Sequence, residues 1–285
     1  MQIEQLSPQQ FERFRNLIYT MSGIRISDNK FSMLSNRIRR RLKAGEFTGF
    51  EVYYRYLTSP QGNGEIEHFL DEITTNETFF FRTTSHFEWF KSEFISQIVS
   101  AERRGTRSRS LRIWSAGCAT GAEPYSIAIC LQENLFRLRD WSLTIVGTDI
   151  SEEALREARE GVFNRRAVEA ATERQLRRCF QSREGDHWQV RPEVRKFVRF
   201  EHHNLMTRMS EPPFDCIFIR NVLIYFDQDS KRTVVKNLIR ALAPGGFLVV
   251  GPSEGIYGML EPLERLSAFL YQKPGTGPGS EARGR

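Results

Sequence analysis

The sequence predicts a doubly wound α/β sheet with a small all-helical N-terminal domain and a small inserted subdomain. After Ser110, short apolar segments alternate with longer helical segments, which is typical of a parallel sheet covered by helices. Before that point the hydrophobic periodicity is helical. A long charged segment, about residues 161–197, interrupts the alternation and predicts the insertion.

The helical domain is expected to cover residues 1–75. Ser7 and Pro8 are typical of a helix start, and Phe11, Phe14, Leu17 and Ile18 follow at three- and four-residue spacing. A second helix is expected from about Asp28 and a third over residues 50–57.

A connecting segment, residues 76–110, should lead into the larger domain, residues 111–273. The strands predicted there cover residues 111–117, 143–148, 198–203, 214–220 and 246–250. The last residues, 274–285, are rich in glycine and proline and are expected to form a flexible tail.

The composition is that of a globular protein, because 40% of the 285 residues are hydrophobic and 27% are charged. The apolar stretches are too short to span a membrane and the chain begins without a secretory signal, so we expect a cytoplasmic protein without membrane insertion. The four cysteines are scattered, and no metal site is predicted. Of 41 basic residues seven are lysines, leaving 34 arginines, a surplus that suits acidic partners.

A glycine-rich turn follows the first predicted strand. Gly117-Cys-Ala-Thr-Gly121 lies directly before a helix, whose free N–H groups can bind a ligand, and it matches neither the dinucleotide fingerprint nor the phosphate-binding loop. Asp149, at the end of the second strand, could bind ribose hydroxyls or cap the next helix with Ser151. Glu123 could cap helix N–H groups or bind the cationic groups of S-adenosylmethionine, which favours a methyl donor over a dinucleotide.

The fourth predicted strand runs into an aromatic loop. Asn221 and Tyr225 lie at its carboxyl end, where doubly wound folds bind their ligands. Structural packing is the alternative role for both.

Five motifs occur in order along the chain. They are Asn76-Glu-Thr-Phe-Phe-Phe-Arg82, Ser115-Ala-Gly-Cys-Ala-Thr-Gly-Ala-Glu-Pro-Tyr-Ser126, Gly147-Thr-Asp-Ile150, His203-Asn-Leu205 and Arg220-Asn-Val-Leu-Ile-Tyr-Phe226. Together they resemble the chemotaxis receptor methyltransferases, the CheR family, over about residues 7–273. One departure is Ala122, because the family usually has Gly-Glu-Glu-Pro where this chain has Gly-Ala-Glu-Pro.

The resemblance implies an S-adenosylmethionine-dependent methyltransferase that converts glutamate side chains of chemoreceptors to 5-O-methyl esters and releases S-adenosylhomocysteine. The connecting segment would then carry a loop that contacts the cofactor. Carried over position by position, the resemblance implies cofactor-binding roles for Asn76, Thr78, Arg82, Glu123, Asp149, Asn204, Leu205, Asn221 and Val222.

Methylation of a carboxylate requires orientation more than acid–base catalysis, because a glutamate is already ionised at pH 7. Arg82, whose planar fork suits a carboxylate, and Tyr225 are therefore the predicted catalytic residues. Two alternatives stay open: a nucleic-acid methyltransferase, which the arginines favour, and an inactive receptor-binding adaptor. No nucleic-acid partner is expected, because an Asn-Pro-Pro-Tyr-type motif is missing from the sequence.

The second predicted helix is strongly basic. Arg37, Arg40 and Arg41 share one of its sides, which could simply be a solvated face. The resemblance implies a partner with an acidic surface, the cytoplasmic helical bundle of transmembrane chemoreceptors. These three arginines are therefore the predicted receptor-binding residues.

Overall fold

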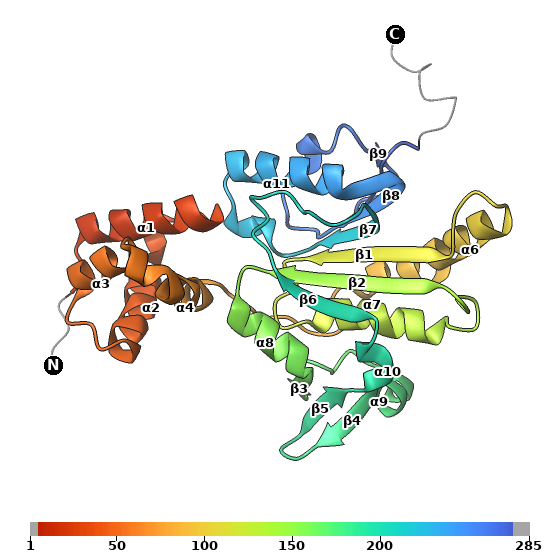
Figure 1. The fold of residues 1–285 in the computed structure, drawn as a ribbon, viewed down its shortest axis with the longest axis horizontal. Helices are drawn as coiled ribbons and strands as arrows, with labels where there is room; N and C mark the ends of the chain where they lie inside the picture. The colour runs from red at the N-terminus through yellow and green to blue at the C-terminus, as the bar shows by residue number, and fades with distance from the viewer. Residues whose placement is uncertain (1–4, 276–285) are drawn as a thin grey trace, which may run out of the picture.

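The computed structural model describes residues 5–275 and confirms the predicted fold class (Figure 1). A seven-stranded sheet has the order β6-β2-β1-β7-β8-β10-β9, and the neighbours from β6 to β8 are parallel. The strands are β1 (Ser110–Ala116), β2 (Ser142–Asp149), β6 (Val198–His202), β7 (Phe214–Ile219), β8 (Leu242–Val250), β9 (Glu264–Arg265) and β10 (Leu270–Gln272). The order reverses between β1 and β7, the place where doubly wound sheets form a ligand crevice.

Four α-helices form a separate layer at one end of the sheet (Figure 1). They are α1 (Pro8–Ser22), α2 (Phe31–Ala44), α3 (Phe50–Leu57) and α4 (Asn63–Ile73). Ser7 caps α1 through a reciprocal capping box with Gln10, as the Ser-Pro start predicts. The helices enclose their own apolar core, in which Phe14 packs against Phe50, Tyr53 and Phe69.

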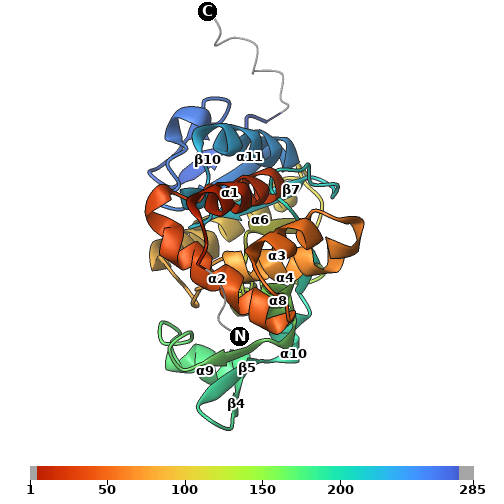
Figure 2. The same ribbon diagram turned by 90° about the vertical axis from the view of Figure 1, so that its left-hand side faces the viewer.

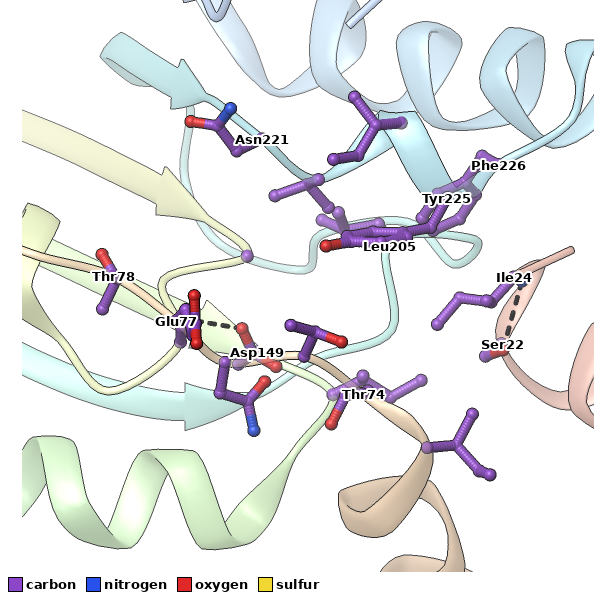
Figure 3. A pocket seen from close by; sticks show the side chains of 18 of the residues that line it. Ser22, Ile24, Thr74, Glu77, Thr78, Asp149, Leu205, Asn221, Tyr225 and Phe226 are labelled. Atoms are coloured by element: carbon purple, nitrogen blue, oxygen red, sulfur yellow. Dashed lines mark hydrogen bonds between the residues drawn. The ribbon is translucent and has the colours of Figure 1, made fainter. Parts of the chain in front are cut away.

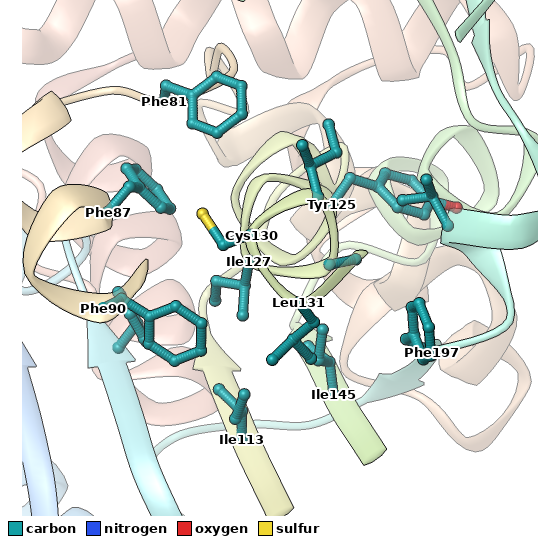
Figure 4. Close-up of a cluster of buried hydrophobic side chains, with 14 of the residues drawn as sticks. Phe81, Phe87, Phe90, Ile113, Tyr125, Ile127, Cys130, Leu131, Ile145 and Phe197 are labelled. Carbon is teal, nitrogen blue, oxygen red and sulfur yellow. The ribbon is translucent and has the colours of Figure 1, made fainter. Parts of the chain in front are cut away.

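The connecting segment is helical and packs on one face of the sheet. It contains α5 (Thr84–Trp89), a π-helical turn (Phe90–Phe94) and α6 (Ile95–Arg103). Figure 4 shows its Phe87 and Phe90 around α7 (Ala122–Glu133), with Ile113 and Ile145 of the sheet on another side. Most side chains of α7 are buried, which explains why its sequence lacks a polar stripe.

The predicted insertion forms a second, antiparallel sheet with the order β3-β5-β4 (Figure 2). After α8 (Glu152–Glu160), the chain forms β3 (Val162–Asn164), α9 (Glu173–Cys179), β4 (Phe180–Arg183), β5 (His187–Val190) and α10 (Pro192–Arg195). Helix α11 (Gln228–Ala241) connects β7 to β8 along the chain and packs on the main sheet.

Strand β8 begins earlier than predicted. The predicted strand covered residues 246–250, whereas β8 starts at Leu242. The reason is an irregular register, in which Phe214 pairs with Leu242 and Cys216 already pairs with Phe247. The extra residues of β8 bulge out of the ladder at this point, with Gly245 in the left-handed region.

The helical layer contacts the loops that follow the parallel strands. Asn204, after β6, donates to the Met21 carbonyl at 2.7 Å, and the Arg25 N–H donates to the Tyr225 carbonyl at 2.9 Å. Ile24 also forms an isolated antiparallel bridge with Phe226. Among residues 5–275, no helix is both long and apolar enough to cross a membrane. Most of the predicted flexible tail, from residue 276 on, lies outside the described residues.

Candidate active site

A cleft of about 500 Å³ lies between the helical domain and the carboxyl ends of the parallel strands. Its volume lies within the usual range for small-molecule sites. Figure 3 shows Ile24, Tyr225 and Phe226 toward one end of the cleft and Thr78 toward the other, with Asp149 between them. All nine predicted cofactor residues and Tyr225 line this one cleft. The arginines of α2 are absent from its lining.

Asp149 lies at the bottom of the cleft, beside the glycine-rich turn. Its two carboxylate oxygens accept the Ala119 N–H at 2.8 Å and the Ser151 N–H at 3.0 Å. Burial raises the pKa of Asp149 and these backbone hydrogen bonds oppose the shift. Because a carboxylate offers about four acceptor positions, both oxygens can still accept ligand hydroxyls. Ser151 is the N-cap of α8, so Asp149 supports the start of this helix through the Ser151 N–H. Helix capping and ribose binding, the two roles considered for Asp149, are therefore compatible.

Glu123 is paired inside the protein. One oxygen accepts the Ser115 hydroxyl at 2.7 Å, and the other accepts the Arg220 guanidinium at 2.8 Å. The Arg220 side chain is only 2% exposed and also donates to the Arg82 carbonyl. The charge of Glu123 is therefore balanced by Arg220 within the protein, and its role toward a cofactor stays a prediction.

The loop after β7 is held by Glu254, a residue that the sequence analysis missed. Glu254 is fully buried, and its carboxylate accepts the N–H groups of Asn221, Val222 and Leu223, the last two at 3.2 and 2.7 Å. Desolvation raises the pKa of Glu254 against the effect of these three donors. Gly251 allows this approach, because a Cβ there would lie 2.6 Å from the carboxylate.

Val222 closes against the glycine-rich turn. A Cβ on Gly117 would lie 2.5 Å from a Val222 methyl group, and Gly117 has φ of 72°. The glycine is therefore required on both counts, backbone conformation and space. This contact joins the loops after β1 and β7 into one wall of the cleft.

Arg82 lies on a strongly constrained loop. Phe80 N–H donates to the Ala167 carbonyl and Phe81 N–H donates to the Ser126 hydroxyl, both at 2.9 Å. The Arg82 carbonyl accepts from Arg220, whereas its side chain lies over the exposed Phe79 ring, 5.4 Å from the ring centre. The backbone is thus fixed, and Arg82 lines both the cleft and a smaller neighbouring pocket.

Left-handed backbone conformations concentrate around the cleft. Of seven non-glycine residues with positive φ in the described chain, four are Phe81, Thr83, Ala119 and Asn221, with φ of 52°, 60°, 48° and 60°. Each costs about 1–2 kcal/mol in an ordinary residue, and such strain often marks functional sites.

The other predicted site residues have distinct positions. Asn76 donates to the Ser151 hydroxyl at 3.2 Å, and Thr78 follows it along the cleft wall. Asn204 is occupied with the Met21 carbonyl and the Met206 N–H, so its side chain joins the two domains, and Leu205 is 7% exposed beside it. Tyr225 is 39% exposed at the cleft.

The three arginines of α2 are engaged within the chain. Arg41 forms a two-pronged pair with Glu65 at 2.9 Å for each bond, and Arg40 donates to Glu72 at 2.6 Å. Arg37 donates to backbone carbonyls at the end of α4. The expected basic face exists, but its charges are largely compensated by acidic and carbonyl groups of α4.

Arg220 and Glu254 are the functional candidates that sequence reasoning did not assign. Each is a charged residue within a few positions of the buried, apolar carboxyl end of a strand, β7 or β8. A charge in that position must be paired, which is the signal that could have found them. Among the described residues, no group of three or more histidine, cysteine or acidic side chains could hold a metal ion.

Family models match nearly the whole described chain. Residues 9–74 match the all-alpha domain of CheR methyltransferases, and residues 76–269 match their SAM binding domain. The chain belongs to the CheR methyltransferase family. It is therefore an S-adenosylmethionine-dependent methyltransferase with the family's two-part organisation.

Curated relatives agree with this CheR assignment. The chemotaxis protein methyltransferase of Escherichia coli K12 is 37% identical over 255 residues, covering 87% of this chain and 85% of the relative. That of Salmonella typhimurium is 35% identical and covers 93% and 90%, and that of Borreliella burgdorferi is 31% identical and covers 94% and 95%. A glycopeptide N-methyltransferase complexed with S-adenosylmethionine matches with a TM-score of 0.33 and 14% identity over 53% of this chain and 48% of the other.

The residues of the CheR cleft fit S-adenosylmethionine. Asp149 offers a buried carboxylate for ribose hydroxyls. Arg220 Nε is a buried donor without a partner in the described residues. The cleft thus combines acceptors and donors that a polar nucleoside derivative with an amino-acid end requires.

Proposed function

We propose that the protein methylates glutamate side chains of chemoreceptors, forming glutamate 5-O-methyl esters. The observation that carries this proposal is that Asp149 and Arg82 line the same cleft, which also contains exposed Tyr225. A cofactor acceptor and a carboxylate-binding cation therefore face one space. The relatives named chemotaxis protein methyltransferases support chemoreceptors as the substrate class.

The proposed reaction is a displacement at a methyl carbon. S-adenosylmethionine supplies an electrophilic methyl group when it is bound. The acceptor carboxylate forms the O–CH₃ bond as the C–S bond breaks, giving an ester and S-adenosylhomocysteine, and no proton is transferred. Because a glutamate with a pKa of about 4.3 is ionised at pH 7, the chain needs to align rather than to deprotonate it.

Arg82 and Tyr225 are the proposed catalytic residues. The Arg82 fork would bind and orient the acceptor carboxylate, and its fixed backbone would reduce the entropy lost in that alignment. Tyr225 would line the path of the acceptor side chain, since its carbonyl is fixed by Arg25 while its ring remains partly exposed. The nine cofactor-binding roles given by the resemblance remain part of the proposal.

A methyl-transfer assay tests this function directly. Purified protein is incubated with radiolabelled S-adenosylmethionine and either receptor cytoplasmic fragments or RNA, and base-labile methyl ester is scored. We expect ester on receptor only, and none with receptor whose candidate glutamates are alanine. Label in RNA would favour the nucleic-acid alternative. Cofactor binding without any transfer would favour an inactive adaptor.

Receptor recognition is proposed to use α2, with Arg40 as its principal contact among the three predicted arginines. Its side chain is 61% exposed, compared with 18% for Arg41. Because Arg37 and Arg41 also join α2 to α4, reversing all three charges would damage the domain itself. Arg40→Glu alone should raise the receptor KM about fivefold at low salt, with a smaller effect at high salt. Arg55→Glu, on α3, is the control of equal charge change, and equal effects would refute a specific role of Arg40.

A further inference from the structure

Arg37 contacts the segment that leaves the helical domain. From the middle of α2 its guanidinium donates to the carbonyls of Ile73 and Thr74, the second at 3.0 Å, and to the Thr75 hydroxyl at 3.2 Å. Three acceptors on three consecutive residues are thus held by a single side chain. Arg37 was predicted to face a receptor, but these contacts are directed at the chain's own interdomain segment.

That segment forms a wall of the cofactor cleft. Residues 73–79 all line the cleft, and they include Asn76 and Thr78. Within residues 5–275, no backbone hydrogen bond joins a group of residues 75–79 to another backbone group. The wall therefore depends on side chains to hold it in place, and an extended segment without such anchors would sample many conformations.

Two other contacts anchor the segment on the methyltransferase side. Asp71, at the end of α4, accepts the Glu153 N–H at 3.3 Å, and Asn76 donates to the Ser151 hydroxyl at 3.2 Å. Both partners belong to the first turn of α8, directly after Asp149. Arg37 holds residues 73–75, which lie between Asp71 and Asn76. Of these three anchoring side chains, Arg37 is the one that belongs to α2.

The Arg37 guanidinium is partly withdrawn from water where α2 meets the interdomain segment. Burial lowers the pKa of Arg37 below its ordinary value, and the Glu72 carboxylate opposes this shift.

We propose that Arg37 is a positioning residue, which fixes residues 73–76 so that Asn76 and Thr78 bind the cofactor. It acts through the segment and does not itself touch the cofactor, since it is absent from the cleft lining. The inference rests on the proposed function only for the roles of Asn76 and Thr78. It assigns to α2 a part in cofactor binding in addition to any contact with receptor.

Arg40 provides a matched control on the same helix. It is an arginine that also reaches α4, but it bonds Glu72, before the segment begins, and its side chain is 61% exposed. Arg37→Ala should weaken S-adenosylhomocysteine binding about tenfold in isothermal titration without receptor, whereas Arg40→Ala should change it less than about twofold. Arg37→Lys keeps the charge and part of the donor set, and should restore about half of the lost binding free energy.

Two further readouts separate positioning from simple loss of stability. Hydrogen exchange at residues 75–79 should accelerate in Arg37→Ala more than exchange in the core of α2 and α4. The KM for S-adenosylmethionine should rise by the same factor as the dissociation constant while kcat at saturation stays within about twofold. A receptor contact would instead raise the receptor KM and leave cofactor binding unchanged.

The proposal is overturned if folded Arg37→Ala binds S-adenosylhomocysteine with a dissociation constant within twofold of wild type. Should that variant fail to fold, Arg37→Lys and Thr75→Val decide the question, because each removes part of the contact. Unchanged binding in both would overturn the proposal, and weaker binding in both would support it. Because the titration contains no receptor, its failure is distinct from failure of the proposed methyl transfer, which is scored on receptor ester.

Discussion

Glu254 gives the sharpest test of how the cleft is built. In Glu254→Gln the side chain keeps its size but replaces one acceptor oxygen with an N–H₂ group. Since one oxygen accepts both the Val222 and the Leu223 N–H, the remaining carbonyl would keep these two bonds and the amide would face the Asn221 N–H. One buried donor therefore loses its acceptor, and the other two lose a charged one.

The expected loss follows from these contacts. A hydrogen bond to a charged group contributes about 1.5–3 kcal/mol, and relief of the desolvation that raises the pKa of Glu254 offsets part of it. We expect the free energy of unfolding to fall by about 2 kcal/mol. Because Asn221 would no longer be held in its left-handed conformation, S-adenosylhomocysteine binding should weaken about tenfold as well.

Urea unfolding and isothermal titration measure the two effects separately. Glu261→Gln is the control, because it makes the same chemical change at an exposed position and should alter stability by less than about 0.5 kcal/mol. An unchanged unfolding free energy in Glu254→Gln would show that its carboxylate does not hold the loop. Lower stability with unchanged cofactor affinity would show that the loop conformation is irrelevant to binding.

Three other predictions follow from the site. Asp149→Asn should weaken S-adenosylhomocysteine binding at least tenfold in titration. Asp215→Asn is the control, because it also disturbs a backbone hydrogen bond but lies outside the cleft, and it should leave this binding unchanged. Arg82→Lys should lower kcat/KM for receptor at least tenfold. The unfolding free energy should change by less than about 0.5 kcal/mol, because the substitution keeps the Arg82 backbone carbonyl that accepts from Arg220. Burial and the nearby Arg220 charge lower the pKa of His86 to about 4. Wild type should therefore lose up to about 3 kcal/mol of unfolding free energy as the pH falls from 6.5 to 4. Urea titrations should show a smaller loss for His86→Phe over that range.

The sequence predicts the parts of the fold that depend on local pattern. The capping box at Ser7 and the N-cap at Ser151 are local signals, and both helices begin where these residues indicate. The last two strands, β9 and β10, were not predicted, because strands of two and three residues carry no periodicity of their own. The position of β10 depends on pairing with β8, and that of β9 on pairing with β10, which are tertiary effects.

The candidate site was predictable as a set of residues but not as a network. Asp149, Asn221 and Tyr225 follow from their position at the ends of strands, and Glu123 follows from its place at the start of a helix. Motif similarity supplied the other residues. The pairing of Glu123 with Arg220 joins positions 97 residues apart, and the bonds from Glu254 to the β7 loop join positions more than 30 apart. Neither separation has a periodicity that a sequence pattern could reveal.

The same interactions that join the two domains also form the walls of the cleft. Asn204 joins α1 to the loop after β6, Arg25 fixes Tyr225, and Arg37 fixes the wall before Asn76. A cofactor that contacts both sides of this cleft should therefore stabilise the observed arrangement of the two domains. By reciprocity, any receptor contact that favours the same arrangement should increase cofactor affinity by the same factor. The helical domain thus forms part of the candidate site, and its removal should weaken cofactor binding even though all nine predicted cofactor-binding residues lie within residues 76–269.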